Sequence, residues 1–150
     1  MSSNHTIHSL QHHFGWDNLN KPVVVVKSGE IIEIDTVDSS GSQLNINSTI
    51  DDVKNLDFSK VNPVTGPIFV EDANEGDVIE VELIDFITSG WGWTAIIPGF
   101  GLLADEFKNP DLNLWKYDKN NPTKSIYSTY GKIPLKPFVG TIGLALKEPG

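Results

Sequence analysis

Four histidines lie within the first 13 residues of the sequence, and they are the side chains best suited to metal chemistry. They are His5, His8, His12 and His13. Imidazole is the commonest metal ligand in proteins, and alternation along a strand could direct two of these rings at one ion. The alternative is a polar amino-terminal segment whose histidines face solvent. No accompanying metal signature fixes the spacing, so the residues alone leave both interpretations open.

A second candidate is the loop Asp38-Ser-Ser-Gly-Ser-Gln43, which follows a predicted strand. A carboxylate at a strand end, followed by a glycine turn, can reach a metal or a substrate without distorting the sheet. The competing interpretation is an Asx turn, in which Asp38 accepts hydrogen bonds from its own backbone. Taken alone, the loop favours the Asx turn.

The third candidate places two tryptophans between glycines, in Ser89-Gly-Trp-Gly-Trp-Thr94, followed by Ile97-Pro-Gly-Phe-Gly-Leu102. A tryptophan in a loop is costly unless its ring packs against something. These rings could wall a small apolar pocket, or they could plug the open end of a sandwich or an oligomer contact. The sequence has no Gly-x-Ser-x-Gly elbow, phosphate loop or dinucleotide fingerprint beside them.

Strands must position most of these residues. The β-branched run Pro22–Lys27 predicts a strand buried on both faces, and Ile68–Glu71 predicts another. Two similar segments, Gly29–Ile34 and Gly76–Val81, each predict a strand that alternates apolar with acidic residues. A duplicated hairpin could explain the similarity, but a common turn-plus-strand solution reached twice is favoured. Asn74–Asp77 predicts the turn before the second segment.

One short helix is predicted, with Ser48 or Thr49 as its cap and Ile50, Val53 and Leu56 at helical spacing. Residues 108–121 are interpreted as a surface excursion, and 133–146 as a bent or edge strand. The expected fold is mainly β: an antiparallel sandwich or barrel-like arrangement with one short helix, in a single domain over residues 1–150. The sequence stops directly after a predicted strand and inside a turn signal, and truncation is one interpretation that this pattern leaves open.

Charge and composition exclude several classes of partner. The sequence has 20 acidic and 11 basic side chains, a net charge of -9 and no cysteine. Such an acidic chain repels nucleic acid and anionic membrane surfaces. The absence of cysteine excludes disulfides and a cysteine nucleophile and suits the cytosol, so a soluble, cytoplasmic protein is expected. The apolar runs are shorter than a bilayer-spanning helix requires.

Several blocks of the sequence resemble the acetamidase/formamidase family in residues, order and spacing. The blocks are Ile7-His-Ser9, Phe14-Gly-Trp-Asp17, Val37-Asp-Ser-Ser-Gly-Ser-Gln-Leu44, Val61-Asn-Pro-Val-Thr-Gly-Pro67, Glu75-Gly-Asp77, Gly90-Trp-Gly-Trp-Thr-Ala-Ile-Ile-Pro-Gly-Phe-Gly-Leu102 and Pro137-Phe-Val-Gly-Thr-Ile-Gly143. The resemblance implies a β-rich hydrolase that converts a linear carboxamide, such as formamide or acetamide, to a carboxylate and ammonia. It also implies a divalent metal, with zinc the favoured ion.

The resemblance assigns roles to particular positions. The polar motif residues carried over are His8, His13, Trp16, Asp17, Asp38, Gly41 and Gln43. The expected catalytic residues are Asp38, Asp17 and Gln43, with Asp38 the leading candidate, and the expected metal ligands are His8, His13 and Asp38. The expected substrate pocket is walled by Trp16, Trp91, Trp93 and Phe100.

The sequence departs from the family pattern in two turns and in its extent. Gly41-Ser42-Gln43 stands where the family usually has Gly-Gly-Gln, and Asp72-Ala-Asn-Glu-Gly-Asp77 replaces Gly-Ala-Glu-Pro-Gly-Asp. Family members are longer and carry a later segment rich in Asp, His and Glu. The chain is therefore expected to be the amino-terminal portion of a longer amidase, completed by a carboxy-terminal half or partner chain, and to form a homo-oligomer. The alternatives are an inactive half of a split enzyme and a non-catalytic β-rich binding or structural module.

Overall fold

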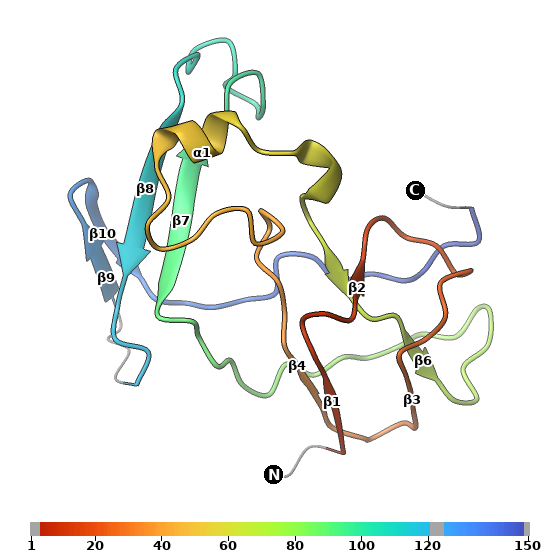
Figure 1. Ribbon diagram of the computed structural model, residues 1–150. Coiled ribbons are helices and arrows are strands. Elements are labelled where there is room, and N and C mark those ends of the chain that lie inside the picture. Colours follow the sequence, from red (N-terminus) through yellow and green to blue (C-terminus); the bar gives the residue numbers. More distant parts are fainter. Residues whose placement is uncertain (1–3, 121–124, 149–150) are drawn as a thin grey trace. The chain divides into compact units, whose positions relative to one another are not determined.

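The computed structural model describes residues 4–120 and 125–148 of the chain (Figure 1). The strands are β1 (His5–Ile7), β2 (His12–His13), β3 (Val24–Val26), β4 (Ile32–Ile34), β5 (Val64–Thr65), β6 (Ile68–Val70), β7 (Trp91–Ile96), β8 (Asp111–Lys116), β9 (Ser125–Ser128) and β10 (Gly131–Pro134). The helices are α1 (Ile50–Lys54) and the short 3-10 helix η1 (Phe58–Lys60). The predicted mainly β fold with one short α-helix is confirmed. Neither helix is long and apolar enough to cross a membrane.

The chain divides into two compact units, each assembled from separate stretches of sequence. Unit 1 contains Met1–Ser42, Asp57–Glu82 and Ile142–Gly150, and unit 2 contains Gln43–Leu56 and Leu83–Thr141. Neither unit can be cut out as one continuous segment, because the chain passes back and forth between them. The single domain over residues 1–150 stays a prediction.

Unit 1 contains three two-stranded pairs. β1 pairs with β4 and β3 with β6, both in parallel, and β2 pairs with β5 in antiparallel. The buried aliphatic side chains are Ile7 on β1 and Val26 on β3. The predicted burial of the valine run on both faces is wrong, since Val25 is 53% exposed. Val25 pairs with Phe69 of β6, which is 50% exposed. These two side chains therefore lie on the solvent-facing side of the β3–β6 pair, whose other side is covered.

Unit 2 is built on an antiparallel ladder between β7 and β8, which runs from the pair Trp91 and Lys116 to the pair Ile96 and Asp111. β9 pairs with β10 in antiparallel, and Ile126 of β9 is buried. The prediction of a surface excursion over 108–121 is wrong, because β8 occupies its centre. Leu112 and Leu114 pair with Ala95 and Trp93 of β7 in the ladder. This pairing stabilises a strand even though Pro110 and Asn120, which disfavour regular structure, flank it.

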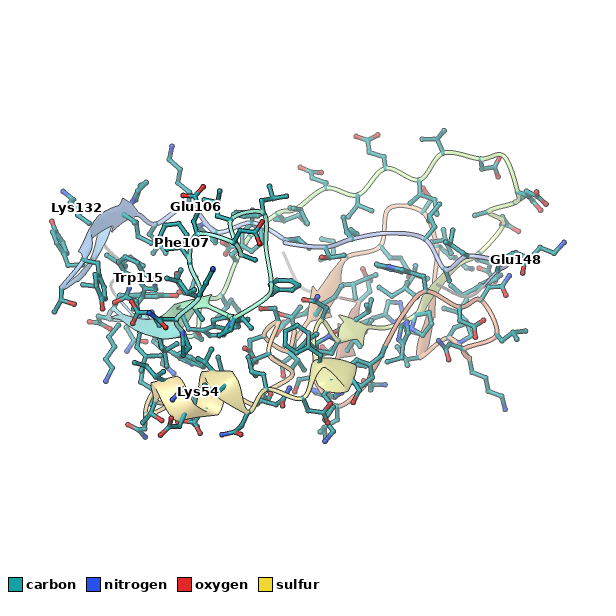
Figure 2. The ribbon with its side chains drawn as sticks, turned by 90° about the horizontal axis from the view of Figure 1, so that it is seen from above. Lys54, Glu106, Phe107, Trp115, Lys132 and Glu148 are labelled. Carbon is teal, nitrogen blue, oxygen red and sulfur yellow. The ribbon has the colours of Figure 1, made fainter. Side chains whose placement is uncertain are left out.

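Helix α1 forms where its capping residues predict it. The carboxylate of Asp52 accepts hydrogen bonds from the backbone N–H of Thr49 (2.7 Å) and from the Thr49 hydroxyl (3.0 Å). Lys54, whose side chain extends from α1 in Figure 2, forms an ion pair with Asp51 at 2.7 Å. Val53 is almost fully buried and anchors the helix to unit 2. The short helix and its Thr49 cap are confirmed.

The strand predicted after Gly76 is wrong, since this segment belongs to no sheet in the described part of the chain. The turn that precedes it is confirmed, with the N–H of Asp77 donating to the carbonyl of Asn74 at 3.0 Å. Beyond that turn the side chains are exposed: Val81 is 56% and Leu83 51% exposed. The pattern of a strand is present, but the described residues offer it no partner strand.

The carboxy-terminal stretch follows β10 as a path without regular structure, and it is fixed to unit 1 at two points. The N–H of Asn18 donates to the carbonyl of Leu146 at 3.0 Å. Gly143 lies against the indole ring of Trp16, so closely that an added Cβ would be 3.2 Å from Cη2 of the ring. On the alternate positions, Ile142 and Leu144 are 62% and 66% exposed. The Trp16 ring therefore packs on one side of this stretch and leaves its aliphatic side uncovered.

We predict that Gly143→Val separates the stretch 142–146 from Trp16, because a branched side chain cannot fit beside the ring. The free energy of unfolding should fall by about 1 kcal/mol. Hydrogen exchange of the Asn18 amide, which bonds to Leu146, should become faster. Gly140→Val is the matched control, since a Cβ at Gly140 meets nothing within 4 Å. Unchanged Asn18 protection in Gly143→Val would contradict the contact.

Candidate functional site

Three of the sequence motifs meet in unit 1 through backbone hydrogen bonds. β2 pairs with β5, which aligns His13 with Val64. The N–H of Gly66 donates to the carbonyl of Gln11 at 3.0 Å and extends this contact. The N–H of Asn62 donates to the carbonyl of Ser39 at 2.9 Å. The segment 61–66 therefore joins the histidine segment on one side to the Asp38 loop on the other.

The rings of His12 and His13 are each held by a backbone carbonyl. Nδ1 of His13 is 3.2 Å from the carbonyl oxygen of Gly66, and Nδ1 of His12 is 2.6 Å from that of Ser9. A carbonyl oxygen can only accept, so each Nδ1 carries the hydrogen and donates it. In the neutral ring Nε2 is then the basic nitrogen. His13 is the partly buried member of the pair, and His12 is exposed.

His5 and His8 have other surroundings. His5 Nε2 is 3.1 Å from a carboxylate oxygen of Glu30. The backbone N–H of Lys27, followed by the His5 ring, lowers the pKa of Glu30 below its ordinary value. His8 is exposed, and its backbone N–H donates to the side-chain oxygen of Gln11 at 2.9 Å. His5 thus links the start of β1 to the turn before β4.

The Asp38 carboxylate accepts hydrogen bonds from its own loop. Oδ2 accepts from the backbone N–H of Ser40 (3.1 Å) and from the Ser40 hydroxyl (2.6 Å), and Oδ1 accepts from the N–H of Ser42 (2.9 Å). Ser40 is 1% exposed. The Asx-turn interpretation of the loop is confirmed. A catalytic or metal-binding role for Asp38 stays a prediction.

Gly41 sets how closely this loop approaches the rest of unit 1. Its φ is +68°, and a Cβ at this position would overlap the carbonyl oxygen of Lys60, the last residue of η1. Only glycine satisfies both the left-handed backbone and the close approach. Ser42 also has a positive φ, +63°, without the steric freedom of glycine. The loop is therefore in direct backbone contact with the end of η1.

Asp57 caps the η1 turn on which the loop lies. Its Oδ1 accepts from the backbone N–H of Ser59 (3.0 Å) and from the Ser59 hydroxyl (2.6 Å), and Oδ2 pairs with the Lys60 ammonium at 2.9 Å. The Ser59 hydroxyl, followed by Lys60, lowers the pKa of Asp57 to about 2. Asp57 is therefore ionised at neutral pH and holds the turn in place.

The other predicted site residues are divided between the units. Asp17 lies in unit 1, where its Oδ1 accepts from the backbone N–H of Leu19 at 2.8 Å. Trp16, beside Gly143, is in the same unit. Gln43 and the pocket residues Trp91, Trp93 and Phe100 belong to unit 2. The structure thus brings the histidine, Asp17 and Asp38 motifs into one unit, whereas the catalytic and pocket assignments stay predictions.

A divalent metal does not fit the described residues of this chain by themselves. Among them, no three or more histidine, cysteine, aspartate or glutamate side chains are placed to hold one ion, and this includes the predicted set His8, His13 and Asp38. The two Asp38 oxygens receive loop donors, and Nδ1 of His13 donates to a carbonyl. We therefore assign no chemical step to a metal, and the zinc site stays a prediction.

Unit 2 contains a surface recess of about 470 Å³ at the start of β7. It is lined by Asn45, Ile46, Ser89, Gly90, Trp91, Tyr117, Asp118 and Lys119. Trp91 is the one member that the sequence suggested as a pocket residue. The sequence analysis does not identify Tyr117, because it interprets residues 108–121 as a surface excursion. The alternation of Leu112 and Leu114 is the signal that could have placed Tyr117 at the end of a strand.

We predict opposite effects for substitutions at two neighbouring positions of the Asp38 loop. Gly41→Ala should lower the free energy of unfolding by at least about 2 kcal/mol, because the new Cβ overlaps the Lys60 carbonyl. Ser42→Gly should raise it by about 0.5 kcal/mol, because glycine relieves the positive φ. Chemical denaturation of the two purified variants measures both changes. An unchanged stability of Gly41→Ala would refute the close approach.

Comparisons with known proteins extend the resemblance seen in the motifs. The chain is 28% identical to a formamidase of Methylophilus methylotrophus over 136 residues, which is 87% of this chain and 32% of that relative. It is 25% identical to an acetamidase of Mycolicibacterium smegmatis over 118 residues, 70% of this chain and 29% of the relative. The chain thus spans about a third of the length of the curated relatives it matches.

Solved structures share the fold. The acetamidase of Bacillus halodurans has a TM-score of 0.83 and 29% identity, covering 96% of this chain and 47% of that one. A predicted acetamidase/formamidase of Thermoanaerobacter tengcongensis has a TM-score of 0.83 and 32% identity, covering 96% of this chain and 46% of that one. The sequence also matches the model of the Acetamidase/Formamidase family over residues 2–149. The chain therefore belongs to the acetamidase/formamidase family.

Proposed function

We propose that this chain supplies the amino-terminal part of an enzyme that hydrolyses small linear carboxamides, of the formamide and acetamide class, to a carboxylate and ammonia. The observation that carries the proposal is the family match over residues 2–149. It is supported by relatives named formamidase and acetamidase, which match most of this chain. An amide of this size carries no group for recognition beyond its carbonyl, its amino group and a hydrogen or methyl.

The chemistry requires an activated water and a proton for the leaving nitrogen, because the amide carbonyl is stabilised by resonance. Within the described residues, the Nε2 of His13 is a basic nitrogen on a ring whose orientation is fixed by Gly66. The Asp38 loop is fixed against η1 by the close approach of Gly41. Rigid support of this kind is what a reacting group needs, since small displacements cost large factors in rate.

We further propose that residues outside this chain complete the reaction centre. The chain covers 47% and 46% of the two solved acetamidase structures, so more than half of each relative lies beyond the match. Acid–base chemistry on an amide needs at least two groups with different roles. The described residues offer fixed histidine and aspartate motifs but no complete cluster, which supports a centre shared with the remaining half.

Release of ammonia tests the proposal. We expect none from the isolated 150-residue chain with formamide or acetamide, because its centre is incomplete. Co-expression with the part of the T. tengcongensis protein that this chain does not cover should restore turnover. A bulky aromatic amide serves as the substrate control, and the T. tengcongensis part expressed alone serves as the protein control. A purified complex that releases no ammonia from either amide would overturn the proposed function.

Substitutions of Asp38 in the complemented enzyme test its predicted role. Asp38→Asn keeps the size of the side chain and one acceptor oxygen, whereas Asp38→Ala removes the bonds accepted from Ser40 and Ser42 and should cost about 2 kcal/mol of stability. If the carboxylate acts in the reaction, both variants should lose at least about 100-fold in kcat despite their different stabilities. Asp35→Asn, an exposed neighbour, is the matched control. A near-normal kcat in Asp38→Asn removes the carboxylate from the mechanism.

A further inference from the structure

The segment 78–85 has the side-chain pattern of a strand, but the part of the chain that the structure describes pairs no strand with it. Ile79, Val81 and Leu83 alternate with Glu80, Glu82 and Ile84. Among the described residues, no backbone N–H or C=O of 78–85 takes part in a backbone hydrogen bond. Val78 is 94% and Val81 is 56% exposed. An unpaired strand with exposed aliphatic side chains is a ready template for pairing with another strand.

The charge around this segment indicates what kind of strand it can accept. The stretch from Glu71 to Asp85, both ends included, has seven acidic side chains and no basic one. Glu80 and Glu82 point to one face of an extended strand, where side chains of a paired strand would lie about 5 Å away. Like charges at that distance repel, so a second copy of this segment is disfavoured as the partner. A strand carrying lysine or arginine is favoured.

The exposed area is larger than a protein of this mass normally leaves uncovered. The accessible surface of the chain is 11352 Å². A compact monomer of 16.5 kDa exposes about 7,600 Å². Even two separate compact proteins of half that mass would expose about 9,100 Å² together. The excess of roughly 2,000 Å² is within the range of obligate protein interfaces.

We propose that residues 78–85 are a docking strand, which pairs with a basic β-strand of a polypeptide equivalent to the part of the solved acetamidases that this chain does not cover. More than half of each of those structures lies outside the match, which is enough chain to cover the excess surface. Main-chain hydrogen bonds would provide the affinity, and Glu80 and Glu82 the selectivity for basic residues. The inference rests on the proposed function for the identity of the partner, but docking requires no turnover.

Co-expression with a tagged polypeptide, the uncovered part of the T. tengcongensis acetamidase/formamidase, tests the proposal. Affinity purification should recover both chains in equal amounts. Hydrogen exchange in the complex should show amides of 78–85 protected, compared with the isolated chain. The affinity should weaken as salt is raised, because the contact is partly ionic. These readouts do not depend on ammonia release, so a complex without activity would contradict the proposed function and leave the docking strand standing.

Two variants separate the contributions of backbone and charge. Val81→Pro removes a backbone donor from the strand, and the double variant Glu80→Lys with Glu82→Lys reverses its charge; each should weaken binding by roughly tenfold or more. The charge-matched control is Asp105→Lys with Glu106→Lys, on the loop between β7 and β8. It should bind normally; Glu106 is labelled in Figure 2. Circular dichroism of each isolated variant should match wild type, since 78–85 makes no backbone pairing with the residues that the structure describes.

Three outcomes would overturn the proposal. The first is failure of the two polypeptides to co-purify. The second is equal recovery with wild type, Val81→Pro and the charge-reversed variant. The third is a dimer of the isolated chain in which the same amides are already protected, because a second copy would then be the occupant.

Discussion

The close approach of Gly41 to the carbonyl of Lys60 is the contact on which the arrangement of the candidate site depends. Asp38 closes its loop by accepting from Ser40 and Ser42, but these bonds alone would leave the loop free to move as a whole. Contact with η1 and the Asn62 bond to Ser39 attach the closed loop to the segment that also holds His13. Asp57 stabilises that segment in turn. A rigid path of backbone contacts therefore connects two motifs that lie far apart in the sequence.

Caps and turns, which depend on neighbouring residues, were predictable from the sequence, whereas the pairing of strands was not. The Thr49 cap, the Asn74–Asp77 turn and the Asx turn of Asp38 each depend on groups a few residues apart, and all three formed as predicted. The segments 29–34 and 76–81 have nearly the same sequence, yet only the first contributes a strand, β4, which pairs with β1. β propensity expresses the fit of a strand to its neighbours, so a pattern without a neighbour does not determine a sheet.

The same limit applied to the candidate site. Composition identified histidines and aspartates, but the partner that fixes the His13 ring is a carbonyl 53 residues later, and no local pattern predicts it. His5 is one of the four histidines in the amino-terminal segment, and no local pattern indicates that its Nε2 lies 3.1 Å from a carboxylate oxygen of Glu30, 25 residues away. The family resemblance identified the histidine, Asp38 and 61–67 motifs, which the periodicity of the sequence does not reveal. The structure joins these three segments through backbone hydrogen bonds.

Two segments of the chain expose aliphatic side chains in a regular alternation. Gly143 faces the Trp16 ring, while Ile142 and Leu144 on the other side of the same stretch are exposed. In 78–85 aliphatic side chains alternate with Glu80 and Glu82, and this segment forms no backbone hydrogen bond within the described part of the chain. Regular alternation confers no advantage on a segment that stays in solvent, because exposed aliphatic side chains invite aggregation. In the proposed docking, a partner strand would cover the aliphatic side chains of 78–85, and Glu80 and Glu82 would restrict which strands can do so.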